Sequence, residues 1–210
     1  MSLSHTTFSG NTYEQGLAHG EILKESIINN IEIYVNRFEN EAGVDKNELL
    51  ENSGIYLNIL REQSPEYVNG MNGIAESSGL GLLEIAMLNL RYELLYHALG
   101  RKLQYDAVDG CTSFAILQEE VENNHLLMGQ NWDWIPDVEC VLTTSIDTDG
   151  MRRMAFTEAG IFGGKPGMNS EGVGLTVNGM YSTVDDWARF QKPFHLRCYE
   201  VLRSTNMEEA

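Results

Sequence analysis

The hydrophobic period of this chain changes at Cys111, and that change limits the folds it can adopt. Before Cys111, apolar residues recur every three or four positions, which is typical of amphipathic helices. After it, short alternating runs are separated by glycine-rich turns, which is typical of antiparallel strands. The sequence therefore predicts an α+β fold, with a helical N-terminal segment over residues 1–110 and antiparallel sheets over 111–210.

Capping residues and glycine stops divide the first segment into four predicted helices. The first runs without a break from residue 12 to about 43, with a capping box at Thr12 and Gln15. The others begin at Asp45, Pro65 and Leu82, and the last of them continues to about Ala98. We expect this half of the chain to be all-helical.

Short strands are predicted in the second segment. Residues 111–118 and 125–131 alternate as two strands joined by a turn at 122–124, so they should pair antiparallel. Residues 140–146 and 151–157 predict a second hairpin around Asp149-Gly150. A short strand ending near Asn178 and a helix from about Pro193 complete the prediction.

Composition excludes several classes of partner. A formal net charge of −17 leaves no basic surface that could neutralise nucleic-acid phosphates or anionic lipids. No apolar run approaches the ~20 residues that a membrane span requires. Three cysteines without a signal peptide predict a reducing, cytoplasmic environment. They form no Cys-x-x-Cys or His-x-x-x-His spacing, so no metal site is predicted.

Cys111 is a candidate nucleophile because it follows a glycine at the change of period. A thiol has a pKa of about 8.5 and needs a base, and a chain-terminal α-amine, at about 7.7 to 8.0, is suited to that role. Such an amine exists only if the Gly110–Cys111 bond is broken. Gly110, which lacks a Cβ, lets the thiol approach its carbonyl closely.

The new α-amine would need an acceptor. The predicted hairpin brings Asp133 next to Cys111, and Asn131 lies on the same face as Asp133 by the two-residue alternation. The alternative from the residues alone is that Cys111 is a small buried apolar side chain, as cysteine often is.

The residues Gly110-Cys111-Thr112-Ser113-Phe114 and Gly129-Gln130-Asn131-Trp132-Asp133 resemble the motif pair of the acyl-coenzyme A:6-aminopenicillanic acid acyltransferase family. This family consists of self-processing N-terminal-nucleophile hydrolases, related to bile-salt hydrolases and acid ceramidase. Further similar stretches include Gly10–Gly20, Gly73–Asn89 and Gly167–Gly172.

The resemblance implies a four-layer αββα sandwich and autocleavage at Gly110-Cys111, giving chains 1–110 and 111–210 that stay associated. It implies Cys111 as the nucleophile and Asp133 as the partner of its α-amine. Asn131, Asn169 and Asn178 are further candidates. Asn178 lies near the strand whose backbone N–H helps to bind the oxyanion in relatives. The expected reaction is amide hydrolysis or acyl transfer through a thioester, on a small acylated amine or acyl thioester. No cofactor is expected, with acyl-coenzyme A as a conceivable acyl donor.

The chain also departs from this family. In its members the oxyanion-hole asparagine and an active-site arginine come from sequence beyond the point where this chain ends. An isolated capping box at Thr205 and Glu208 agrees with an expectation that the fold is incomplete at its C-terminus.

Two alternatives remain open at this stage. The chain could be a noncatalytic relative that stays uncleaved and binds a ligand, or an uncleaved enzyme that uses a histidine as base. The histidines considered for that role are His97, His125 and His195. The three tryptophans, Trp132, Trp134 and Trp187, could line an acyl pocket or belong to an aromatic core.

Overall fold

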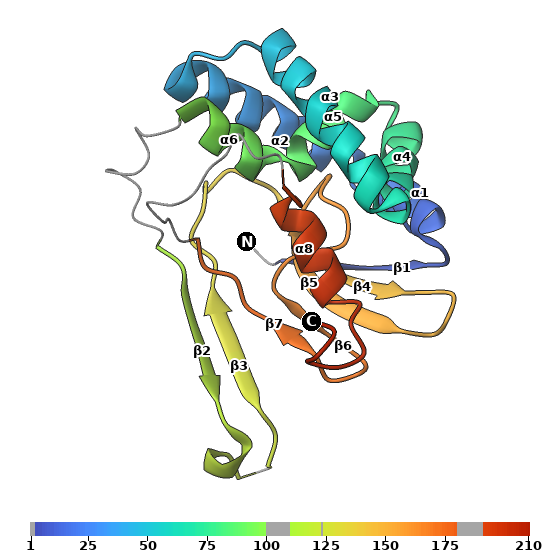
Figure 1. Cartoon of the computed structure of the whole chain (residues 1–210), viewed down its shortest axis with the longest axis vertical. Coiled ribbons are helices and arrows are strands. Elements are labelled where there is room, and N and C mark those ends of the chain that lie inside the picture. Colours follow the sequence, from blue (N-terminus) through green and yellow to red (C-terminus); the bar gives the residue numbers. More distant parts are fainter. Residues whose placement is uncertain (1–2, 100–109, 123, 180–190) are drawn as a thin grey trace.

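The chain before Gly110 is mostly helical, and the chain after it contains every described strand except β1, joined by loops (Figure 1). The computed structural model describes residues 3–99, 110–122, 124–179 and 191–210. The helical elements are α1 (Thr12–Ile22), α2 (Lys24–Arg37), the π-helical turn η1 (Phe38–Ala42), α3 (Lys46–Gln63), α4 (Pro65–Ser78), α5 (Leu82–Asn89), α6 (Arg91–Leu99), the 3₁₀ turn η3 (Gln118–Glu120) and α8 (Phe194–Val201). The strands are β1 (Ser4–Ser9), β2 (Thr112–Ile116), β3 (Leu127–Asn131), β4 (Cys140–Ile146), β5 (Arg152–Glu158), β6 (Gly167–Asn169) and β7 (Gly174–Leu175).

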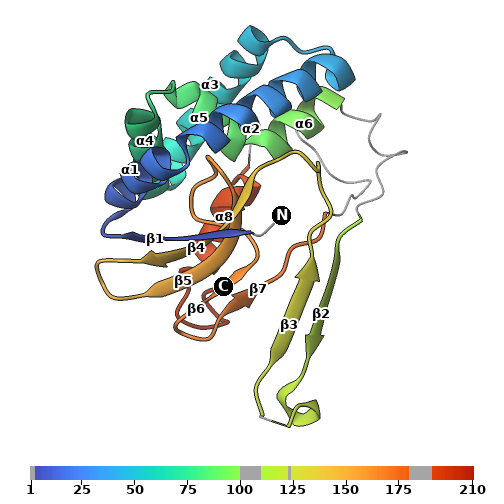
Figure 2. The same ribbon diagram turned by 180° about the vertical axis from the view of Figure 1, so that it is seen from behind.

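Two sheets are present in the described part of the chain. A five-stranded sheet has the order β1-β4-β5-β6-β7, with β1 parallel to β4 and the other neighbours antiparallel. The second sheet is the antiparallel hairpin of β2 and β3. Figures 1 and 2 show helices α1–α6 gathered on one side of the larger sheet, with the hairpin extending away from both. This arrangement confirms the α+β class.

Several helix ends lie where the sequence predicts them. The side chains of Asp45 and Ser64 cap α3 and α4, each accepting hydrogen bonds from backbone N–H groups of the first turn. Gly43 and Gly79 follow η1 and α4 in the left-handed conformation that glycine adopts without strain. These signals are local, so the sequence alone was sufficient to locate them.

The predicted helix from 12 to about 43 is wrong in two respects. It breaks at Leu23 into α1 and α2, and its cap is Asn11, whose side chain forms a capping box with Glu14. Helix α1 packs closely on α4 through glycine: a Cβ added at Gly16 would lie 2.1 Å from the carbonyl oxygen of Gly70. The helix predicted from Leu82 to Ala98 is likewise divided, at Leu90, into α5 and α6.

The expectation of an all-helical first half is corrected by strand β1. Its sequence, Ser-His-Thr-Thr-Phe-Ser, contains one large apolar residue, Phe8, which is buried. The strand therefore has no apolar alternation that a sequence pattern could detect. It pairs in parallel with β4, from Ser4 beside Val141 to Ser9 beside Ile146.

One core joins the helices to the segments after Gly110. The predicted stripe of α4, from Val68 to Ala75, is buried in it, as are Ile161 and Phe162. Leu196 and Tyr199 bring α8 into the same core. No helix in the described ranges is long and apolar enough to cross a membrane.

Some predictions lie outside the described residues. These are the helix stop at Gly100, the loop from 101 to 109, the central residue of the turn at 122–124 and the role of Trp187.

Candidate active site

The hairpin positions Cys111 and Asp133 at one end of its ladder. Five residue pairs run from Ile116 opposite Leu127 to Thr112 opposite Asn131, so Cys111 and Asp133 both lie just past that end, within two residues of the last pair. The thiol sulfur of Cys111 accepts a hydrogen bond from the backbone N–H of Asp133 at 3.5 Å. The same sulfur lies 3.6 Å from the Asp133 carbonyl oxygen.

The carboxylate of Asp133 lies against the backbone of Gly110. A Cβ added at Gly110 would be 2.1 Å from Oδ2 and 2.8 Å from Cγ of Asp133, so a side chain at that position would displace the carboxylate from where it lies. Glycine before Cys111 therefore makes room for this carboxylate. The sequence pointed to Gly110 because a missing Cβ lets the thiol approach its carbonyl, and it did not reveal the contact with Asp133.

Asn178 also contacts Cys111, at its backbone carbonyl. Its amide Nδ2 donates to the Cys111 carbonyl oxygen at 2.8 Å, and its Oδ1 accepts from the Ser113 hydroxyl at 2.6 Å. The neighbouring residue, Val177, is held by Gln130. The Val177 N–H donates to Gln130 Oε1 at 2.7 Å, and Gln130 Nε2 donates back to the Val177 carbonyl.

Cys111 is half-buried, and Gly110, Asp133 and Asn178 are exposed. Cys111 is thus more exposed than Cys198, which is buried in the core and whose pKa burial raises to about 12. The arrangement differs from the alternative in which Cys111 is a buried apolar side chain.

The other predicted residues lie apart from this contact set. Asn131 is exposed, and its side chain makes no hydrogen bond within the described residues. Asn169 is buried, and its amide is fully used: Oδ1 accepts from the N–H groups of Glu171 and Val173, and Nδ2 donates to the carbonyls of Leu202 and Ser204. Asn169 therefore ties the β6 turn to the end of α8 in this structure.

The two tryptophans that flank Asp133 rest on a buried ionic cluster. The Lys165 ammonium lies 4.3 Å from the ring centre of Trp132, and the Arg91 guanidinium lies 4.8 Å from that of Trp134. The Trp134 indole N–H donates to the Tyr34 hydroxyl, which donates to Glu158. Both tryptophans thus serve as aromatic anchors for the segment that carries Asp133.

Glu158 is the centre of that cluster and pairs with both Arg91 and Lys165. Burial would raise the pKa of Glu158, but the two cations hold it well below its usual range. Burial lowers the pKa of Lys165 to about 8, against the opposing attraction of Glu158. No sequence pattern indicates this cluster, because its members are far apart along the chain.

His195, one of the candidate bases, lies in the interior. Its Nδ1 is 2.7 Å from the Asn89 carbonyl oxygen, and burial lowers its pKa well below the usual value. His97 and His125 are exposed. Within the described ranges no group of three or more histidine, cysteine or acidic side chains is arranged to hold a metal ion.

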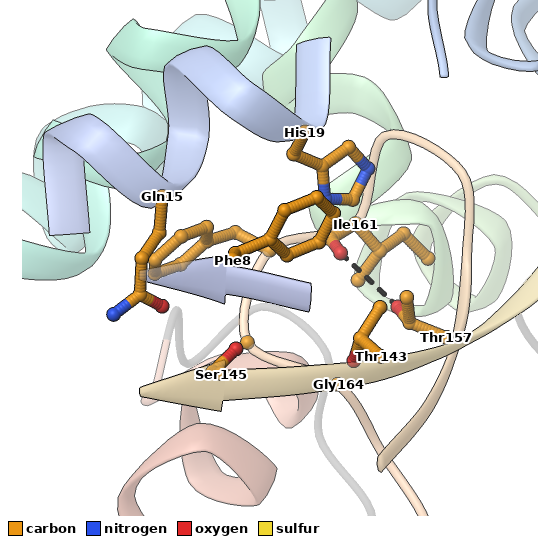
Figure 3. A pocket seen from close by; sticks show the side chains of 10 residues that line it. Phe8, Gln15, His19, Thr143, Ser145, Thr157, Ile161 and Gly164 are labelled. Carbon is orange, nitrogen blue, oxygen red and sulfur yellow. Dashed lines mark hydrogen bonds between the residues drawn. The ribbon is translucent and has the colours of Figure 1, made fainter. Parts of the chain in front are cut away.

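A small pocket lies elsewhere, between α1, β1, β4 and the loop after β5 (Figure 3). His19 stacks on Phe8 at its wall, and His19 Nε2 accepts a hydrogen bond from the Gly160 N–H at 2.9 Å. Burial lowers the pKa of His19 to about 4, so this histidine is neutral. No nucleophile lines the pocket apart from hydroxyl groups, and Cys111 and Asp133 are not part of it.

No protein-family model matches the chain. Against curated proteins, it is 29% identical over 208 residues to the "acyl-coenzyme A:6-aminopenicillanic-acid-acyltransferase 40 kDa form" of Emericella nidulans. The match includes 98% of this chain and 55% of the relative. The resemblance to that acyltransferase family is confirmed. The chain spans about half the length of this acyltransferase, so the activity of a whole acyltransferase is only a proposal for this chain.

Proposed function

We propose that this chain is an N-terminal-nucleophile cysteine hydrolase or acyltransferase that cuts itself between Gly110 and Cys111. The observation that carries the proposal is the contact of the Asp133 carboxylate with the Gly110 backbone, beside the half-buried thiol of Cys111. A carboxylate at this point is suited to bind an ammonium group that forms at the Cys111 nitrogen.

The proposed cleavage begins with attack of the Cys111 sulfur on the Gly110 carbonyl carbon. The Gly110–Cys111 C–N bond breaks, a thioester joins Gly110 to the sulfur, and the nitrogen takes a proton to become the α-amine of Cys111. Water then hydrolyses the thioester, which releases a Gly110 carboxylate and restores the thiol. The products are chains 1–110 and 111–210.

In the cleaved protein the Cys111 α-amine acts as the base for its own thiol. An α-amine has a pKa of about 7.7 to 8.0, close enough to that of a thiol to exchange a proton near neutral pH. The thiolate attacks the carbonyl of an amide or acyl thioester, and the acyl group passes to water or to another amine. Asp133 holds the ammonium form in place.

Asn178 and Asn131 are proposed to assist. Asn178 donates a hydrogen bond to the Cys111 carbonyl and is the stronger candidate. Asn131 is exposed and pairs with Thr112, the residue next to Cys111. An oxyanion donor of this kind contributes about 10²- to 10³-fold to rate. Asn169 has all its amide hydrogen bonds engaged, which favours a structural role.

The resemblance also suggests the complete fold, the substrate class and the cellular setting. We infer an αββα sandwich, of which the described helical layer and five-stranded sheet would form part. The substrate is a small acylated amine or acyl thioester, with no cofactor, nucleic acid or membrane involved, and the setting is cytoplasmic.

The rival is a noncatalytic relative that folds around an uncut chain. Intact-mass measurement of the purified protein separates the two. The proposed function predicts two species, residues 1–110 and 111–210, and a Cys111→Ala chain that stays whole. Cys140→Ala removes another half-buried thiol and serves as the matched control, which should be cut like the unsubstituted chain.

Two results would overturn the proposed function. One is an unsubstituted chain that remains a single species after prolonged incubation. The other is a Cys111→Ala chain that is still divided at residue 110, since that cut would come from a contaminating protease.

A further inference from the structure

Two side chains that face each other across the hairpin both hold the segment that contains Asn178. Ser113 on β2 and Gln130 on β3 are register partners. The Ser113 hydroxyl donates to the Asn178 side chain, and the Gln130 amide exchanges two hydrogen bonds with the backbone of Val177. The two residues therefore act on adjacent positions of one segment.

Gln130 binds Val177 much as a neighbouring strand would. Its amide supplies one acceptor and one donor to the N–H and the carbonyl of a single residue, which is the pairing that a strand residue makes in an antiparallel ladder. Met128, two residues earlier on the same face of β3, contacts the backbone at Gly174, where an added Cβ would lie 2.9 Å from its sulfur. The segment from 174 to 178 thus lies along one face of the hairpin.

We propose that Ser113 and Gln130 are positioning residues that hold Asn178 on the carbonyl of Cys111. This inference deepens the proposed function and rests on it for the catalytic consequence, but not for the structural one. The hydrogen bonds form a chain: Ser113 Oγ–H to Asn178 Oδ1, then Asn178 Nδ2–H to Cys111 O. The Cys111 carbonyl can only accept, so Asn178 Nδ2 faces it, and the Ser113 hydroxyl satisfies Oδ1 at the other end of the amide.

The need for such a hold follows from the proposed cleavage. An N-terminal residue has no preceding peptide bond, so its orientation depends on its α-amine and on its own carbonyl. Asp133 is placed to hold the first, and Asn178 holds the second. Loosening Asn178 would leave the thiol with more orientations, and a misplaced nucleophile loses rate without losing substrate affinity.

The test uses Ser113→Ala, Gln130→Leu and the conservative Ser113→Thr, with Thr112→Ala as the matched control. Thr112 is the neighbouring hydroxyl on β2, and its side chain makes no hydrogen bond in the described part of the chain. We expect Ser113→Ala and Gln130→Leu to slow cleavage at Gly110–Cys111 about fivefold to tenfold, followed by intact-mass measurement over time. Ser113→Thr should restore most of the rate, and Thr112→Ala should leave it unaltered.

A second readout does not depend on activity. In the uncleavable Cys111→Ala background, hydrogen exchange at the Val177 amide should become at least fivefold faster with Gln130→Leu and should not change with Thr112→Ala. Unchanged exchange in Gln130→Leu would overturn the proposed hold on Val177, whether or not the chain cleaves.

Cleavage rates of the variants test the catalytic part of this inference. If the unsubstituted chain cleaves but Ser113→Ala and Gln130→Leu cleave at the same rate, the positioning role is wrong and the proposed function stands. An equal loss of rate in Ser113→Thr and Ser113→Ala would also overturn it. Failure of the unsubstituted chain to cleave counts against the proposed function and is seen before any of these variants is made.

Discussion

At the scale of single residues, the decisive contact joins Gly110 to Asp133. The carboxylate occupies the volume that any Cβ at position 110 would fill. Glycine before Cys111 therefore lets the carboxylate lie against the backbone at this point.

This contact predicts the behaviour of Gly110→Ala. The added methyl group overlaps Asp133 Oδ2 and Cγ, so Asp133 or the backbone must move. Both residues are exposed and the carboxylate can swing aside, so we expect a loss of only about 1 kcal/mol in the free energy of unfolding, measured by urea denaturation in the Cys111→Ala background. Cleavage in the Cys111 chain should slow as the carboxylate is displaced.

A double-mutant cycle isolates the cause. Asp133→Ala removes the two overlapping atoms and leaves only a Cβ at 3.1 Å, so Gly110→Ala should cost much less in that background. An equal cost in both backgrounds would show that the carboxylate is not the obstacle.

The sequence predicted the proximity of Cys111 and Asp133 because hairpin register follows from alternation and turn position. It could not predict which atoms would touch. The roles of Ser113 and Gln130 depend on a segment about 50 residues later, and the two residues have ordinary strand positions. Contacts of this kind arise from tertiary packing and leave no periodic signal.

At the scale of elements, a buried carboxylate links α6 to α8. Glu93 Oε1 accepts a hydrogen bond from the Phe194 N–H at 2.7 Å, at the first turn of α8. Its other oxygen, Oε2, is buried without a hydrogen-bond partner among the described residues. Burial raises the pKa of Glu93 to about 7.

This linkage predicts a dependence of stability on pH. Because the folded pKa exceeds the ordinary value of 4.5, the folded chain holds the proton more tightly, and the free energy of unfolding falls as pH rises from about 4.5 to 7. Glu93→Gln should therefore match the unsubstituted residue near pH 4.5 and be about 2 to 3 kcal/mol more stable above pH 7.

Urea denaturation at several pH values, again in the Cys111→Ala background, measures this difference. Glu62→Gln, an exposed change on α3, is the matched control and should show no such divergence. A constant offset between Glu93→Gln and its parent across this pH range would contradict the prediction.

Helix ends were predictable where a cap is local, as at Asp45, Ser64 and Gly79. The breaks at Leu23 and Leu90 were not, because apolar periodicity continues through both positions. Strand β1 also escaped prediction, since its place in the sheet depends on β4 and not on its own composition.

At the scale of the whole molecule, the Glu158 cluster joins the two sides of the proposed cleavage point. Tyr34 and Arg91 precede Gly110, whereas Glu158 and Lys165 follow it. All four are buried. The cluster is thus a polar contact between the two proposed chains inside their shared core.

Removing the carboxylate should weaken this contact strongly. Glu158→Gln leaves Arg91 and Lys165 buried without an anion, and we expect a loss of about 3 to 5 kcal/mol in the free energy of unfolding. Glu66→Gln, which removes one exposed partner of Arg203, is the control and should cost less than about 1 kcal/mol. Similar losses in the two variants, measured by urea denaturation, would contradict the expected contribution of the Glu158 cluster to the free energy of unfolding.

The parallel pairing of β1 with β4 has a consequence for the order of events in the life of this polypeptide. While the backbone is continuous, the first strand searches for its neighbour as a tethered segment, at a high effective concentration. If the backbone were cut at the proposed site before folding, the same encounter would become a collision between two separate molecules. The proposed scission should therefore follow folding, and the two halves synthesised from separate messages should assemble poorly.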